Sequence, residues 1–298
     1  FNFLSVCMRT LKTLLNTTRP PFLILTPACV AVGVATAFWQ NHQLNGWHVI
    51  VVLLGALASH ISVNAFNEYF DFKSGLDATT KRTPFSGGSG TLPNHPDLAT
   101  HTLWLACASL FLAAGVGIYF MSIRGWALLP LGLTGLLLLI VYTTWCAYHP
   151  ILSLFSPGLG FGPLMVMGTH FALTGEYTWT ALIASLPIFF LVNDLLLLNQ
   201  FPDKAADQAA GRRNVVISFG RPACAKVYGL FLLIAYAIVV LAVLLNALPF
   251  FCLLALLSTP LAWKAFQGAR QHADTIQKLW PAMGLNVSIN IVTPLLLA

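Results

Sequence analysis

Charge is scarce in this chain of 298 residues. Asp, Glu, Lys and Arg together make up 8% of the sequence, whereas they make up about 25% of a typical soluble domain. Hydrophobic residues make up 57%, and the mean hydropathy is +0.78. This balance excludes a large soluble protein and predicts an integral membrane protein with many spans. No polar stretch is long enough for a second domain, so we expect one membrane domain over residues 1–298.

Clustered cysteines are also missing. The six cysteines are spread through mainly apolar stretches, with no Cys-x-x-Cys and no Cys/His group of zinc spacing. This pattern is typical of small core residues. The formal net charge of +6 does not require nucleic acid, because excess Lys and Arg in a membrane protein reflects its orientation and its contact with anionic headgroups. We therefore predict membrane lipid, and no nucleic acid, among the partners.

Long apolar segments dominate what is present. A helix needs about 20 apolar residues to cross a hydrocarbon core of about 30 Å. Nine segments meet this requirement: 21–40, 47–69, 101–121, 125–147, 154–174, 178–198, 224–244, 247–265 and 279–297. They predict an all-α bundle of nine transmembrane helices. Before the first span, an apolar stretch interrupted by Arg9 and Lys12 predicts an interfacial helix within residues 1–18.

The connections between the spans are unequal. Two of them, 70–100 and 199–223, are long and polar, whereas most others are short. Nine spans place 14 of the 15 Lys and Arg residues on the side of the N-terminus, and only Arg124 on the other. Basic residues mark the cytoplasmic side. We therefore expect the N-terminus and both long loops in the cytoplasm, and the protein in a bacterial inner membrane.

Each long connection begins with the same acidic pattern. The two motifs are Asn67-x-x-x-Asp71, which continues to Asp77, and Asn199-x-x-x-Asp203, which continues to Asp207. Residues four apart lie on one face of a helix, so each motif would project its oxygens together if the span continued past the membrane. Crowded carboxylates are best tolerated with a divalent cation between them, and oxygen ligands favour Mg²⁺. The sequence therefore predicts a Mg²⁺ site.

Basic residues accompany both motifs. Lys81 and Arg82 follow the first motif, and Lys204, Arg212 and Arg213 accompany the second. Mg²⁺ alone would not need them, but a metal-bound diphosphate would, because Arg binds phosphate oxygens in bidentate fashion. The glycine-rich stretch 86–90 fits a lid over this site or a plain linker equally well. Asp194 lies inside the sixth span, where an acid is either functional or a protonated or paired structural residue.

The motifs together resemble the UbiA superfamily of intramembrane prenyltransferases, whose members carry two Asp-rich motifs after the second and sixth of nine helices. The resemblance spans nearly the whole chain. Further elements that resemble the family are Arg19-Pro20, Tyr142, Tyr148-His149-Pro150, Gly158-Leu159-Gly160 and Gly211-Arg212-Arg213. It implies a bundle with a central cavity that opens to the cytoplasmic side.

The resemblance also implies a mechanism: Mg²⁺-dependent ionisation of a polyprenyl diphosphate, followed by attack of an aromatic ring on the allylic cation. It assigns two Mg²⁺ ions to Asn67, Asp71, Asn199 and Asp203, with Asp77 and Asp207 completing the site. It assigns the leaving diphosphate to Lys81, Arg82, Lys204, Arg212 and Arg213. In this reading Tyr142 or Tyr148 stabilises the cation by a cation–π contact.

The spacing of the first motif resembles most the branch that prenylates 1,4-dihydroxy-2-naphthoate in menaquinone synthesis. Other acceptors, such as 4-hydroxybenzoate, homogentisate or another quinone or lipid precursor, remain alternatives with the same chemistry. A cation-coupled transporter is a different class. Its carboxylates would line a path across the membrane, whereas here most acids cluster beside basic residues at one end of the spans.

Overall fold

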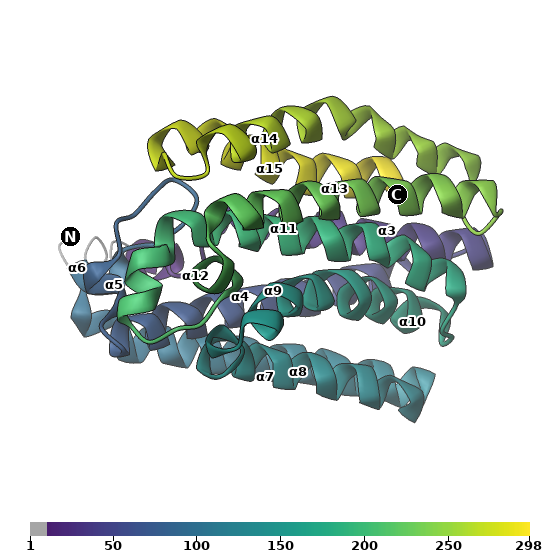
Figure 1. The fold of residues 1–298 in the computed structure, drawn as a ribbon. Helices are drawn as coiled ribbons and strands as arrows, with labels where there is room; N and C mark the ends of the chain where they lie inside the picture. The colour runs from purple at the N-terminus through teal and green to yellow at the C-terminus, as the bar shows by residue number, and fades with distance from the viewer. Residues whose placement is uncertain (1–10) are drawn as a thin grey trace.

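The computed structural model describes residues 11–298, which form an elongated bundle of roughly parallel and antiparallel helices (Figure 1). Nine helical segments of this described part are long and apolar enough to cross a membrane, and it contains no β-strand. The prediction of an all-α bundle with nine spans is therefore confirmed. Of the predicted interfacial helix, residues 1–10 lie outside the described part, and residues 11–16 are helical.

Some of the spans are single helices and others are broken. The spans are, in order, α2 with α3 (Pro20–Leu23, Leu25–Asn41), α4 (Gly46–Lys73), α7 (Ala99–Arg124), α8 (Leu129–Thr144), α9 with α10 (Pro150–Leu159, Gly168–Thr174) joined by a π-helical segment (Gly160–Met167), α11 (Trp179–Ala209), α13 (Arg221–Leu244), a 3₁₀ segment with α14 (Phe250–Ser258, Thr259–His272), and α15 (Ile276–Leu297). Short helices α5 (Leu76–Thr79), α6 (Thr91–Asn94) and α12 (Val215–Phe219) lie in the connections, with 3₁₀ turns at Pro96–Leu98, Trp126–Leu128 and Cys146–Tyr148.

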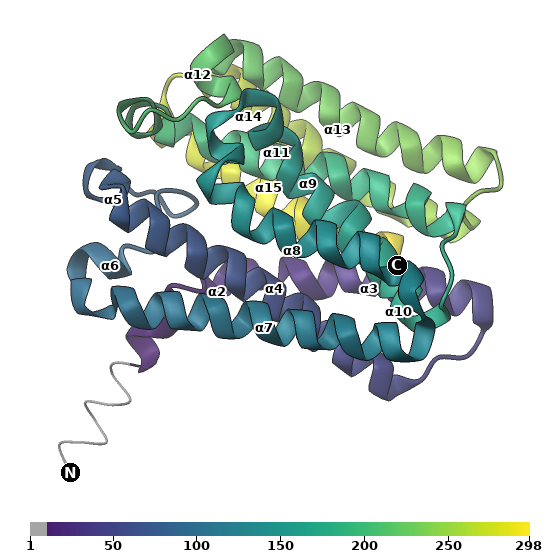
Figure 2. The same ribbon diagram turned by 90° about the horizontal axis from the view of Figure 1, so that it is seen from below.

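Helix α11 is the centre of the bundle and the most buried of the spans. It packs against α3, α9, α13 and α15, and Figure 2 shows α4 and α7 side by side in a layer below it. Two glycines, Gly158 in α9 and Gly162 in the π-helical segment, let this span approach α11 closely. A Cβ at Gly158 would lie 2.2 Å from the carbonyl oxygen of Phe189, and one at Gly162 would lie 2.8 Å from the carbonyl oxygen of Ser185. Only glycine permits such contact between backbones.

The two helices that carry the acidic motifs are longer than the predicted spans. Helix α4 ends at Lys73 rather than near 69, and α11 ends at Ala209 rather than near 198. The prediction of a loop that begins at residue 199 is therefore wrong for 199–209. Four alanines between 205 and 210 favour helix, and Pro202 removes only one backbone donor. Residues 70–100 contain α5 and α6, so this connection is also partly helical.

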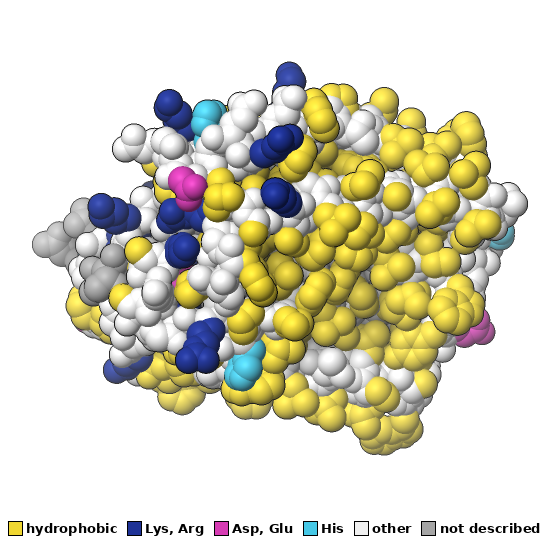
Figure 3. Space-filling model, viewed as in Figure 1, with side chains coloured by type: hydrophobic (Ala, Val, Ile, Leu, Met, Phe, Trp, Pro, Cys, Tyr) yellow, Lys and Arg dark blue, Asp and Glu magenta, His cyan; other side chains and the backbone are white. Residues whose placement is uncertain are grey.

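The two ends of the bundle differ in charge. Lys and Arg side chains gather at the end that carries α5, α6 and α12, and the rest of the face in Figure 3 is mainly hydrophobic. Arg124 lies at the opposite end, where its guanidinium donates to the carbonyl oxygens of Ala172 (3.0 Å) and Leu173 (2.5 Å). The guanidinium thus satisfies the free carbonyls at the end of α10. The clustering matches the basic asymmetry of the sequence, and the cytoplasmic assignment of that end stays a prediction.

Candidate active site

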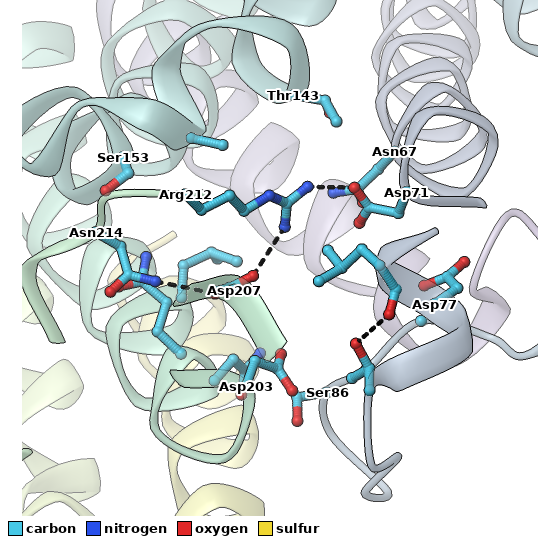
Figure 4. Close-up of a pocket in the computed structure, with 18 of the residues that line it drawn as sticks. Asn67, Asp71, Asp77, Ser86, Thr143, Ser153, Asp203, Asp207, Arg212 and Asn214 are labelled. Atoms are coloured by element: carbon cyan, nitrogen blue, oxygen red, sulfur yellow. Dashed lines mark hydrogen bonds and ion pairs between the residues drawn. The ribbon is translucent and has the colours of Figure 1, made fainter. Parts of the chain in front are cut away.

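A polar cavity of about 120 Å³ lies at the basic end, between the ends of α4 and α11 (Figure 4). Residues from the ends of several spans and from both long connections line it. Of the predicted site residues, the lining includes Asn67, Asp71, Asp77, Tyr142, Asn199, Asp203, Asp207 and Arg212. It also includes Arg19, Ser86, Gly87, Gly88, Thr143, Ser153, Gln200 and Asn214. Segments more than 100 residues apart in the chain thus meet in one site.

Helical geometry explains how each motif reaches the cavity. Asn67 and Asp71 lie one turn apart on α4, and Asn199, Asp203 and Asp207 lie on successive turns of α11. Residues four apart share a face, so the extension of both helices past the predicted spans carries the whole of each motif to the cavity. The structure thus brings the two motifs together at one cavity.

Arg212 connects the two motifs directly. Its Nη2 forms an ion pair with Oδ1 of Asp71, and its Nη1 lies 3.1 Å from Oδ1 of Asp207. Although burial lowers the pKa of the guanidinium, the carboxylates of Asp71 and Asp207 raise it by more, so Arg212 is a cation. Asn214 caps α12 through its Oδ1 and donates from Nδ2 to Oδ2 of Asp207 at 2.9 Å. Asp207 is therefore held by two donors from the connection after α11.

Several buried oxygens of the cavity have no hydrogen-bond partner among the described residues: Oδ1 of Asn67, Oδ2 of Asp77, Oε1 of Gln200 and Oδ1 of Asp203. Buried acceptors are normally paired. A set of unpaired carboxylate and amide oxygens fits a hard cation such as Mg²⁺, which binds oxygen ligands and completes its shell with water and phosphate oxygens. The donor set therefore fits the predicted metal.

Within residues 11–298, no three His, Cys, Asp or Glu side chains are already grouped closely enough to hold one metal ion. Two features of the site account for this. The first position of each motif is an amide rather than a carboxylate, and the guanidinium of Arg212 lies between Asp71 and Asp207. A metal here would take amide and diphosphate oxygens as well as carboxylates, so the metal assignments stay a proposal.

Glu68 fastens the glycine-rich stretch beside the cavity. The carboxylate is fully buried and accepts from Nε of Arg19 (2.8 Å), and from the backbone N (2.7 Å) and Oγ (2.6 Å) of Ser89. Gly88, at φ +73°, passes so close that a Cβ there would lie 3.1 Å from Oδ1 of Asp77. The stretch 86–90 is therefore tied to α4 and contributes Ser86, Gly87 and Gly88 to the cavity lining, while a lid that moves stays a prediction.

Asp77 is an acidic residue of this cavity that lies outside the transmembrane spans, and its pKa is shifted. Burial, and after it the nearby carboxylates of Glu68 and Asp71, raise its pKa to about 7. The guanidinium groups of Arg19 and Arg82 oppose this. A carboxyl with this pKa gains a full negative charge most readily when a cation is nearby.

The structure does not bring every predicted residue to the cavity. Five predicted residues are absent from its lining: Tyr148, Lys81, Arg82, Lys204 and Arg213. Tyr148 is 37% exposed, and Lys81, Arg82 and Arg213 are exposed at the surface. Arg82 lies against Gly90, where a Cβ would be 1.8 Å from its Nη1. Of the predicted diphosphate ligands, only Arg212 lines the cavity.

Sequence reasoning missed several residues that the structure places in the site. Arg19 was noted only as part of an Arg-Pro element, Glu68 was given no role, and neither Gln200 nor Asn214 was proposed. A signal for Glu68 and its partner existed in the sequence. The chain has only nine acidic residues among 298, and an acidic residue inside an apolar helix is almost never buried without a partner. Glu68 therefore required a basic partner, although its spacing from Arg19 could not be inferred.

A second, larger cavity of about 360 Å³ lies in the apolar part of the bundle. Residues of α4, α7, α8, α10 and the π-helical segment line it, and nearly all of them are apolar. Helices α4 and α8 reach both cavities: His60 and Leu139 line the apolar one, whereas Asn67 and Tyr142 line the polar one. The site thus combines a charged compartment with an adjoining apolar one.

Comparisons with known proteins agree with this architecture. The model of the UbiA prenyltransferase family matches residues 25–289. The chain is 29% identical to the 1,4-dihydroxy-2-naphthoate octaprenyltransferase of Bacillus subtilis (strain 168), over 86% of this chain and 81% of that protein. It is 24% identical to the 2-carboxy-1,4-naphthoquinone phytyltransferase of Synechocystis sp., over 99% of this chain and 94% of that protein.

Solved structures show the same fold at low identity. An apo UbiA homolog from Aeropyrum pernix K1 has a TM-score of 0.71 and 14% identity, covering 92% of this chain and 95% of that one. A UbiA homolog from Archaeoglobus fulgidus bound to DMAPP and Mg²⁺ has a TM-score of 0.63 and 14% identity, covering 95% of this chain and 97% of that one.

Proposed function

The chain belongs to the UbiA prenyltransferase family and is a multi-pass membrane prenyltransferase, and on this premise we propose that it transfers a polyprenyl group from its diphosphate to 1,4-dihydroxy-2-naphthoate in a Mg²⁺-dependent reaction. The observation that carries the proposal is that a polar and an apolar cavity neighbour each other along α4 and α8. Unpaired oxygens from both acidic motifs line the polar cavity, and an apolar cavity of about 360 Å³ adjoins it along α4 and α8. A polyprenyl diphosphate has the same two parts.

Mg²⁺ would be held by Asn67, Asp71, Asn199, Asp203 and Asp207. When bound, the metal neutralises negative charge on the diphosphate oxygens and so eases departure of the leaving group. We propose two ions, one for each motif, and that Asp77 completes the site. The presence of Mg²⁺ with DMAPP in the Archaeoglobus fulgidus homolog supports the metal.

Arg212 is the protein's own cation in the polar cavity. In the structure it bridges Asp71 and Asp207, which are two of the proposed metal ligands. Since metal and guanidinium both pair with these carboxylates, Mg²⁺ would free Arg212 to bind diphosphate oxygens. There it would stabilise the charge that builds up as the carbon–oxygen bond breaks. We propose that Lys81, Arg82, Lys204 and Arg213 attract the anionic substrate from the surface, because they lie outside the cavity lining.

The apolar cavity would hold the isoprenoid chain. Its lining excludes water from the allylic cation that forms when the diphosphate leaves, and this prevents hydrolysis. Tyr142 lines the polar cavity on α8, three residues after Leu139 of the apolar lining, so it would stabilise the cation through its ring. Tyr148 is less well placed for this role because it is 37% exposed and lies outside the lining. A ring carbon of the acceptor then forms the new carbon–carbon bond, and a proton is lost.

The naphthoate acceptor is supported by the names of two similar proteins, from Bacillus subtilis and Synechocystis. The proposal places the enzyme in a bacterial inner membrane, with the polar cavity facing the cytoplasm, where the positive-inside rule puts the basic end. Prenyl transfer to another quinone or lipid precursor is the alternative that shares every step up to the attack of the acceptor.

An acceptor panel tests this proposal. Purified protein in lipid nanodiscs is incubated with Mg²⁺, a polyprenyl diphosphate and, separately, 1,4-dihydroxy-2-naphthoate, 4-hydroxybenzoate and homogentisate, and products are identified by mass spectrometry. We expect a prenylated product only in the incubation that contains 1,4-dihydroxy-2-naphthoate. A product from another acceptor alone would refute the naphthoate assignment and keep the reaction class. If no acceptor is prenylated, ion flux through the same protein in sealed proteoliposomes would favour the transporter.

A further inference from the structure

Asp194 is an ionisable residue inside the bundle, apart from the polar cavity. It lies midway along α11 with its side chain fully buried, and neither carboxylate oxygen has a hydrogen-bond partner among the described residues. In that part of the chain, no Lys, Arg or His forms an ion pair with it. A bare carboxylate at this depth in a membrane would cost several kcal/mol. Some positive species must therefore neutralise Asp194.

Helices α13 and α15 supply polar groups around it. Tyr228 on α13 is fully buried, interacts electrostatically with Asp194, and has a hydroxyl without a partner among the described residues. On α15, Nδ2 of Asn286 donates to the backbone carbonyl of Asp194 at 3.1 Å. Asn290 donates from Nδ2 to the carbonyl of Asn286 at 3.0 Å, and its Oδ1 has no donor in the described part. We call these four residues the Asp194 cluster.

One added proton would remove the unpaired charge of the Asp194 cluster. Neither carboxylate oxygen of Asp194 has a hydrogen-bond partner among the described residues, and the hydroxyl of Tyr228 and Oδ1 of Asn290 are also without one. Protonation turns one carboxylate oxygen into a donor and removes the charge. We propose that the Asp194 cluster is a proton-binding site and that Asp194 is a neutral carboxylic acid in the resting protein.

The proton site is separate from the chemistry of prenyl transfer. Asp194 precedes Asn199 by five residues, which places the two side chains about 140° apart around α11 at 100° per residue, and Asp194 does not line the polar cavity. The Asp194 cluster instead joins α11 to α13 and α15. Its proton therefore lets the helix that carries Asp203 and Asp207 pack without an unpaired charge. The inference stands whether or not the naphthoate is the acceptor.

Infrared difference spectroscopy on the full chain in nanodiscs tests the site. The variant is Asp194→Asn, which resembles the protonated carboxyl in shape and charge, and the matched control is Asp97→Asn, at an exposed aspartate. At pH 8 we expect the spectrum of wild type minus D194N to contain the carbonyl band of a protonated carboxylic acid. Wild type minus D97N should contain carboxylate bands instead. Carboxylate bands in the D194N difference would overturn the proposal.

Tyr228→Phe keeps the test available if D194N does not fold. This variant retains the carboxyl and removes the polar hydroxyl that interacts electrostatically with it, so the acid band should persist at a shifted frequency. Loss of the band would overturn the protonated state, and an unshifted band would remove Tyr228 from the site.

A salt comparison distinguishes the proton from a sodium ion, which also fits a set of oxygen acceptors. Thermal unfolding is measured in sodium chloride and in choline chloride. We expect the melting temperature of the wild type to be the same in both salts. The melting temperature of D194N should lie within about 3 °C of the wild-type value. Stabilisation of the wild type by sodium, lost in D194N, would show that a metal ion rather than a proton neutralises Asp194.

Discussion

Helix α11 carries three aspartates in two different settings. Asp203 and Asp207 lie in its last turns, beside the cation Arg212 and a second set of oxygens from α4. Asp194 lies in the middle, fully buried, with no cationic partner in the described part of the chain. The same side chain is thus suited to metal and diphosphate at the end of the helix, and to a proton at its centre. The difference lies in what surrounds the carboxylate.

Removal of a carboxylate from either motif should have the largest effect. We expect Asp71→Ala and Asp203→Ala each to lower Mg²⁺-dependent release of diphosphate by at least about 100-fold, as removal of one group that stabilises developing charge does. The measurement is the initial rate of diphosphate release at saturating Mg²⁺. Asp194→Asn on the same helix is the matched control and should keep most of the activity. Full turnover by D71A or D203A would refute the shared metal site.

Neutralisation of Arg212 should move two affinities in opposite directions. In Arg212→Gln the carboxylates of Asp71 and Asp207 lose their resident cation, so Mg²⁺ alone should bind roughly tenfold more tightly. The Mg²⁺-dependent affinity for a prenyl diphosphate should fall by about tenfold or more, because a charge-assisted contact is lost. Calorimetric titration measures both, with the exposed neighbour in Arg213→Gln as the control. A parallel change of both affinities would contradict the dual role.

These two predictions depend on features that the sequence reveals to different degrees. The nine spans and both motifs could be predicted, because a run of about 20 apolar residues and a repeated Asn-x-x-x-Asp are local patterns. The further course of α11 through residue 209 could not, since a polar stretch that contains Pro202 also fits a loop. Which basic residue enters the cavity depends on the path of the connection after α11. Arg212 and Arg213 are neighbours in sequence, yet only Arg212 lines the site.

The contact between Arg19 and Glu68 is a second feature that could not be predicted from the sequence. The two residues are 49 positions apart, and their pairing depends on how α2, which begins directly after Arg19, packs against α4. Composition indicates that a buried acid needs a partner, but only the packing of the helices selects it. Glu68 also accepts two hydrogen bonds from Ser89 and so ties the stretch 86–90, which the sequence left open between a lid and a linker, to α4.

A bulkier side chain in the apolar cavity should affect long substrates selectively. Gly135 lines this cavity and has no atom within 4 Å of an added Cβ, so Gly135→Leu would occupy the space proposed for the isoprenoid chain. Overpacking costs about 1–3 kcal/mol, which would lower kcat/KM for long polyprenyl diphosphates by about 5- to 150-fold. The rate with dimethylallyl diphosphate should change little. Gly115→Leu, equally open but outside the cavity lining, is the control.

Titration of Asp77 should produce the smallest effect. Its pKa is about 7 in the folded protein and about 3.9 in an unfolded chain. The folded state therefore binds the proton more strongly, and this contribution to stability is present below pH 4 and is lost as the pH rises to 7. Without Mg²⁺, the wild type should lose a few degrees of melting temperature over this range relative to Asp77→Asn. Parallel pH profiles of the two proteins would contradict the shifted pKa.

The most direct test of the central claim is whether the two motifs form one site. Binding of an unreactive thiolodiphosphate analogue of a polyprenyl diphosphate, in the presence of Mg²⁺, is measured for wild type, D71A, D203A and the double variant in nanodiscs. If α4 and α11 build a single site, each single variant loses most of the affinity, and the double variant is little weaker than either. Losses that simply add, or half of the binding capacity retained by each single variant, would show two independent sites and contradict the account.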